Sequence, residues 1–105
     1  MMLRAAALGL ALLGCSTPEP KTYQDEIRGM QFVPAELTVN VGDTIVWTNE
    51  DVVPHTATSG VAAPISFDSK ELASKQTWQL TVTASGEYAY ACTYHPTMTG
   101  KLVVR

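Results

Sequence analysis

The sequence is poor in cysteine, in histidine, in long apolar runs and in basic residues. Its 105 residues include two cysteines and two histidines, and seven Lys and Arg against ten Asp and Glu give a net charge of −3. This acidic balance argues against nucleic acid as a partner, because nucleic-acid binding needs a basic face. The leading apolar run, residues 5–13, is shorter than the roughly 20 residues that a membrane-spanning helix takes. No segment after residue 15 has the 3.6-residue apolar period of an amphipathic helix, so a helical domain is not expected.

The first residues have the features of an export signal. Arg4 precedes the apolar run, and the run leads directly into Leu12-Leu13-Gly14-Cys15. This motif resembles the bacterial lipoprotein signal, in which the cut falls before the cysteine and the cysteine then carries lipid. We therefore expect a signal peptide over residues 1–14, lipidation of Cys15, a membrane tether over residues 15–26 and one domain over residues 27–105. The protein would then be anchored on the periplasmic or cell-surface side of a membrane. The alternative is an ordinary secretory leader in which Cys15 has no role.

A seven-residue segment near the C-terminus carries three metal-ligand side chains. Cys92, His95 and Met98 are separated by two residues each, a spacing that suits one tight loop around a single ion. Two His, one Cys and a weak axial Met form the site of blue-copper electron-transfer proteins. The loop lacks one imidazole, and the only other histidine of the sequence is His55. The sequence therefore predicts a mononuclear copper site made of His55, Cys92, His95 and Met98.

The cysteine usage supports a metal role for Cys92. If Cys15 carries lipid, Cys92 is an unpaired thiol in an exported protein, and such a thiol needs an explanation. Copper ligation supplies one. The alternative is a buried, inert cysteine that packs as a small apolar residue, and Met98 has the corresponding alternative of apolar packing beside the site.

Short alternating or β-rich segments, separated by turn signals, predict an all-β domain. The expected strands cover residues 27–32, 37–41, 44–48, 77–83, 87–92 and 100–104. Such a series is typical of a β-sandwich or barrel, here with seven to eight strands. The large aromatic side chains are expected in the core or on the sheet faces, namely Trp47, Trp78, Tyr88 and Tyr90. Four acidic side chains are expected to be solvated, namely Glu50, Asp51, Asp68 and Glu71.

From Met30 to Arg105 the chain resembles a cupredoxin, the family of small blue copper proteins, and within it amicyanin and plastocyanin. The ligand loop has the amicyanin spacing. The other matching pieces follow in a fixed order, namely Phe32-Val33-Pro34, Val41-Gly42-Asp43, Val46-Trp47-Thr48-Asn49, Pro54-His55 and Gly86-Glu87-Tyr88. The resemblance implies a Greek-key antiparallel β-sandwich with one copper ion, which alternates between Cu(I) and Cu(II), at one end. It also implies two imidazole ligands from His55 and His95, a thiolate ligand from Cys92 and a long axial bond from Met98.

The resemblance implies an electron carrier and not an enzyme, because four protein ligands leave no open position for a substrate. Redox donor and acceptor proteins would dock near His95, which in this family reaches the surface among apolar residues, and the protein is expected to be a monomer. A second possible function is copper storage or delivery, with labile Cu(I) and no intense blue colour. A third is a Cys–His hydrolase with Cys92 as nucleophile and His55 or His95 as base, which leaves Met98 without a role.

The resemblance raises two further expectations about the neighbours of the site. In this family an Asn near the first His braces the two ligand loops, and Asn49 is the candidate for that role. Amicyanin-type loops have Pro where this chain has Tyr94, and Tyr94 keeps a backbone N–H that Pro lacks. We expect this N–H to donate a hydrogen bond to the sulfur of Cys92.

Overall fold

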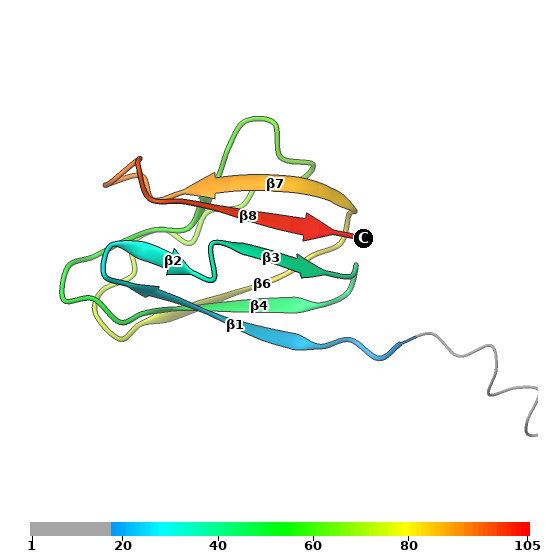
Figure 1. Ribbon diagram of the computed structural model, residues 1–105, viewed down its shortest axis with the longest axis horizontal. Helices are drawn as coiled ribbons and strands as arrows, with labels where there is room; N and C mark the ends of the chain where they lie inside the picture. Colours follow the sequence, from blue (N-terminus) through cyan, green and yellow to red (C-terminus); the bar gives the residue numbers. More distant parts are fainter. Residues whose placement is uncertain (1–17) are drawn as a thin grey trace, which may run out of the picture.

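The computed structural model describes residues 18–105, so the expected signal peptide and Cys15 lie outside the described residues. Eight strands form two four-stranded sheets that face each other (Figure 1). The first sheet has the order β2-β1-β4-β6, with β1 (Thr22–Arg28), β2 (Gln31–Val33), β4 (Thr44–Asn49) and β6 (Thr77–Thr81). The second has the order β3-β8-β7-β5, with β3 (Glu36–Val39), β5 (Thr58–Ser59), β7 (Gly86–Ala91) and β8 (Thr99–Val104). In this part of the chain no helix is long and apolar enough to cross a membrane.

This all-β sandwich of eight strands confirms the fold class expected from the sequence. The sheets are mixed, however, and not antiparallel throughout. β1 pairs in parallel with β4, and β3 pairs in parallel with β8. Parallel neighbours need a crossover connection between them, and here each crossover passes from one sheet to the other and back. The chain therefore ties the two sheets together at both ends.

The core forms where the alternating strands turn their apolar side chains inward. In β4, which the sequence predicts as a β-rich run, Ile45 and Trp47 are fully buried because alternate side chains of a strand point to the same face of the sheet. Trp47 lies at the centre of an aromatic cluster: its ring stacks on Phe67 and Trp78, with ring centroids 5.7 Å away in each case, and meets the edge of Tyr90 at 5.5 Å. The expected placement of the aromatic residues in the core and on the sheet faces is confirmed.

The first strand begins earlier than the sequence predicts. Residues 22–26, which the sequence assigns to the tether, lie in β1 and pair with β4. The start of this strand was not predicted because Asp25 occupies an inward-facing position in β1. An apolar residue is expected at such a position. Asp25 is 0% exposed, and neither of its carboxylate oxygens has a hydrogen-bond partner among the described residues. Desolvation by this burial raises the pKa of Asp25 to about 7.

The expected strand over residues 27–32 is also interrupted by a turn. Gly29 and Met30 both have φ near +61°, and they join β1 to β2 as a hairpin. Two consecutive residues with positive φ are the requirement of a type I′ hairpin turn, and Gly29 meets it without steric cost. Pro34 directly follows β2, which is an edge strand, as the sequence indicates.

The connections gather at the two ends of the sandwich (Figure 1). One end holds the β1–β2 turn, the segment that follows β4 and the loop between β7 and β8. The opposite end holds the turn between β3 and β4, the C-terminus and the entry of the chain into β1. The predicted ligands therefore lie at the first end, and the described chain enters β1 at the second.

Candidate metal centre

The predicted ligand loop is closed by its own backbone. Cys92 directly follows β7, and Met98 directly precedes β8. The N–H of Cys92 donates to the carbonyl of Met98 at 3.1 Å, and the N–H of Met98 donates to the carbonyl of His95 at 2.8 Å. These two bonds fold the seven residues into one tight turn, as the ligand spacing predicts.

His55 reaches the same end from the segment that follows β4. Its backbone forms a two-way bridge with Leu72: the N–H of His55 donates to the carbonyl of Leu72 at 3.1 Å, and the N–H of Leu72 donates back at 2.8 Å. The residue is 0% exposed. The imidazole is therefore held in the interior, next to the residue that follows β7.

The structure brings three of the four predicted ligands together. The sulfur of Cys92 lies 3.7 Å from Nδ1 of His55 and 3.9 Å from Nδ1 of His95. The ligand atoms of these three residues all lie within 4.8 Å of one another. Cys92 and His55 are fully buried, and His95 is partly exposed. One thiol and two imidazole nitrogens thus converge on a single point near the surface.

These separations fit a shared metal ion. A metal–sulfur bond of about 2.3 Å and a metal–nitrogen bond of about 2.0 Å, the lengths found in zinc sites, place the two atoms about 3.7 Å apart when the bonds meet at about 120°. Both sulfur–nitrogen distances lie close to this value. A soft sulfur with two imidazoles is a donor set that suits copper.

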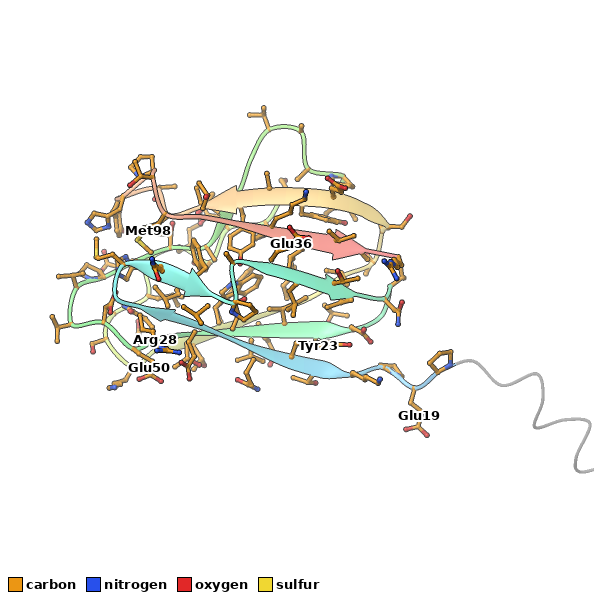
Figure 2. The ribbon with its side chains drawn as sticks, viewed as in Figure 1. Glu19, Tyr23, Arg28, Glu36, Glu50 and Met98 are labelled. Atoms are coloured by element: carbon orange, nitrogen blue, oxygen red, sulfur yellow. The ribbon has the colours of Figure 1, made fainter. Side chains whose placement is uncertain are left out.

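The fourth predicted ligand lies at the same end of the sandwich. Met98 is 4% exposed, and Figure 2 shows it at the end of the sandwich where the loop between β7 and β8 lies. Its backbone bonds to Cys92 and His95 hold it within the ligand loop. Coordination by its thioether stays a prediction.

One expectation about the ligand sulfur is wrong. Among the described residues, the backbone N–H that donates to the sulfur of Cys92 belongs to Thr56, at 3.4 Å, and no such bond comes from Tyr94. Tyr94 is exposed, and its hydroxyl donates to Glu71 at 2.9 Å. The donor to the sulfur therefore comes from the His55 segment and not from the ligand loop itself.

The contact expected between the His55 segment and the ligand loop is made by a residue other than Asn49. Asn49 is buried, but its amide donates to the carbonyls of Val53 and Leu72 at 2.9 Å each, and neither belongs to the ligand loop. The contact between the two segments is made by Thr56, whose hydroxyl accepts the N–H of Thr93 at 2.9 Å. The sequence signal for it was present, since Thr56 directly follows the first histidine.

A carboxylate that the sequence did not predict lies beside the first imidazole. Asp51 was expected to be solvated, but its side chain is only 16% exposed, and its Oδ2 lies 2.8 Å from Nε2 of His55. Burial opposes ionisation, but the N–H of Met30, the imidazole of His55 and the N–H of Gly29 outweigh it and hold the pKa of Asp51 below its usual value. The spacing of four residues between Asp51 and His55 was the available signal.

Comparisons with known proteins agree with this donor set. The model of a family described as copper-binding proteins of the plastocyanin/azurin family matches residues 20–105. Amicyanin from Paracoccus denitrificans is 38% identical over 81 residues, which cover 75% of this chain and 62% of that protein. Chloroplastic plastocyanin from Chlamydomonas reinhardtii is 34% identical over 110 residues, which cover 95% of this chain and 75% of that protein. The chain spans about three fifths of the length of the Paracoccus amicyanins that it matches.

Comparison with solved structures also finds copper proteins. The oxidized state of an amicyanin mutant superposes with a TM-score of 0.75 at 34% identity, and the match covers 80% of this chain and 82% of that one. A copper-containing nitrite reductase from Thermus scotoductus superposes with a TM-score of 0.77 at 31% identity. The match covers 88% of this chain but only 24% of the reductase, so the likeness is to one part of that enzyme.

Proposed function

The chain belongs to the plastocyanin/azurin family of copper-binding proteins, and on that premise we propose that it is a type 1 copper electron carrier, which passes single electrons between redox partners. The observation that carries the proposal is the convergence of Cys92, His55 and His95. Their separations fit one ion, and their chemistry is that of a blue-copper site.

We propose His55, Cys92, His95 and Met98 as the four ligands of this ion. Bound copper supplies the one-electron chemistry, since it alternates between Cu(I) and Cu(II). The protein contributes a stiff frame, because Cys92 follows β7 and His55 is bridged to Leu72. A site that keeps one compromise geometry in both oxidation states needs little rearrangement when an electron is transferred.

The burial of the ligands favours a carrier over an enzyme. Cys92 is 0% exposed, so a substrate cannot reach its sulfur as a hydrolase mechanism requires. His95 is the partly exposed member of the cluster. Several exposed apolar side chains lie on the segments at this end, namely Met30, Val52, Val53 and Tyr94. We propose that donor and acceptor proteins dock here, and that electrons pass through the imidazole of His95.

The test is the visible spectrum of the copper-loaded protein, followed by voltammetry. A blue-copper carrier is expected to show an intense blue colour and a reversible one-electron wave. A storage or delivery module is expected to bind Cu(I) that a chelator removes readily, without that colour. A Cys92→Ser variant serves as the control, because it removes the thiolate to which the colour is assigned. A colourless loaded protein refutes the carrier function.

We also propose that residues 1–14 are a signal peptide and that Cys15 carries the lipid of a membrane anchor. The protein would then lie on the periplasmic or cell-surface side of the membrane, as a monomer. Support comes from the place where the chain enters β1, which is the end of the sandwich opposite the ligands (Figure 1). An anchor at that end leaves the metal end free to meet other proteins.

A further inference from the structure

The buried imidazole of His55 has different partners on its two nitrogens. Nδ1 faces the sulfur of Cys92 at 3.7 Å, and Nε2 lies 2.8 Å from Oδ2 of Asp51. Since His55 is 0% exposed, no water competes for either nitrogen. A carboxylate accepts hydrogen bonds and cannot donate them when ionised, so Nε2 carries the proton. The nitrogen that faces the other ligands is therefore the one with a free lone pair.

The carboxylate of Asp51 is itself held in place by a different part of the chain. The N–H of Gly29 donates to its Oδ1 at 2.7 Å, and the N–H of Met30 donates to its Oδ2 at 3.0 Å. Both donors point at the carboxylate because Gly29 and Met30 form the left-handed turn between β1 and β2. The backbone N–H of Asp51 donates to the side chain of Asn49 at 2.9 Å, which fixes the main chain as well.

We propose that Asp51 is a positioning residue for the metal centre, which orients the imidazole of His55, keeps its proton on Nε2 and lowers the reduction potential of the bound copper. A carboxylate that accepts the other N–H of a histidine ligand makes that ligand more basic. The oxidised site carries one more positive charge than the reduced site, so a nearby negative charge stabilises it more. The electron is the only particle transferred, and the proton on Nε2 stays in place. This inference rests on the proposed copper function.

The alternative is that Asp51 only braces the β1–β2 turn. The chain contains a matched control for that role. Asp43 also accepts two backbone N–H groups, from Lys21 and Asn40 at 2.8 Å each. It lies in the turn between β3 and β4, at the end of the sandwich opposite the ligands (Figure 1). An Asp43→Asn variant therefore removes an equal charge and a similar brace without touching the metal centre.

The experiment compares the reduction potentials of the wild type, Asp51→Asn and Asp43→Asn. Loss of the group that accepts a hydrogen bond from a metal-binding histidine costs about 10- to 100-fold in metal affinity. If Cu(II) loses tenfold more affinity than Cu(I), the potential rises by about 59 mV, the one-electron equivalent of a factor of ten. We expect a rise of at least that size for Asp51→Asn and a much smaller one for Asp43→Asn. Equal shifts in the two variants overturn the proposal.

Two further measurements separate this inference from the copper function. Nitrogen NMR of the metal-free wild type is expected to show the proton of His55 on Nε2, whether or not copper is the natural metal; a proton on Nδ1 overturns the inference. An Asp51→Glu variant keeps the charge, so its potential is expected to stay closer to wild type than that of Asp51→Asn. If the reduction potential shifts equally in Asp51→Glu and Asp51→Asn, the inference is contradicted. If the copper-loaded wild type shows no blue colour, the proposed function is refuted. The NMR result then still tests whether Asp51 keeps the proton of His55 on Nε2.

Discussion

The hydroxyl of Thr56 accepts a hydrogen bond from the backbone N–H of Thr93 at 2.9 Å. Thr56 follows His55 and Thr93 follows Cys92, so this bond joins the two ligand segments one residue beyond each ligand. The backbone N–H of Thr56 donates to the sulfur of Cys92 at 3.4 Å. One residue thus joins the two ligand segments, in line with the pairing of β5 and β7, and its N–H reaches the ligand sulfur from the side of the first imidazole.

Thr56→Ala removes the acceptor of the Thr93 N–H but keeps the backbone donor to the sulfur. Thr93 is exposed, so water can reach its N–H once the acceptor is removed. The expected loss is therefore that of an ordinary hydrogen bond, about 0.5–1.5 kcal/mol in the free energy of unfolding. Urea unfolding of the metal-free protein measures this loss. Thr56→Ser keeps the hydroxyl and is the matched control; an equal loss in both variants shows that the hydroxyl does not brace the segments.

Asp25→Asn is expected to change the pH dependence of stability. The pKa of Asp25 is raised from 3.8 to about 7 in the folded state, so the folded protein binds more protons than the unfolded chain between these values. Its stability therefore falls as the pH rises through this window, by up to about 4 kcal/mol. The variant is expected to match the wild type near pH 4 and to be more stable at pH 8.

Thermal unfolding of both proteins across this pH range tests the prediction for Asp25. The quantity to follow is the difference between variant and wild type, because other titrating groups contribute equally to both. A difference that stays constant from pH 4 to pH 8 shows that the carboxyl of Asp25 does not titrate in the folded state near pH 7.

Met98→Leu is expected to raise the reduction potential if the thioether is the axial ligand. Leucine keeps the apolar volume but offers no lone pair, so the oxidised copper loses more stabilisation than the reduced copper. Voltammetry measures the shift. Met30→Leu is the control, because Met30 lies at the same end of the sandwich but outside the ligand loop. If the two variants have the same potential, Met98 only packs beside the site.

Cys15→Ala is expected to release the protein from the membrane without changing the copper centre. The precursor is expressed in a bacterium that processes lipoproteins, and the membrane and soluble fractions are compared. The wild type is expected in the membrane fraction and the variant in the soluble fraction. The absence of an added lipid mass on the wild type, or equal partition of both proteins, contradicts lipidation.

The sequence by itself determined the features that depend on short spacings. The ligand loop was predictable because Cys92, His95 and Met98 lie within one turn. The strands were predictable where residue types alternate, as in β7, and where β-rich residues follow one another, as in β4. The family was recognisable because these short pieces follow one another in order, and the comparisons confirm it.

Only the tertiary structure decided how distant residues share a contact. The meeting of His55 and Cys92 depends on which strand ends lie together, and no local period records that arrangement. The same holds for Asp51, which looked solvated until the β1–β2 turn supplied its hydrogen bonds. It also holds for Asp25: its inward position could not be predicted from the sequence, so the first half of β1 was not predicted as a strand. Both carboxylates are typical of surface residues in the sequence, because the segments that cover them come from other parts of the chain and meet them only after folding.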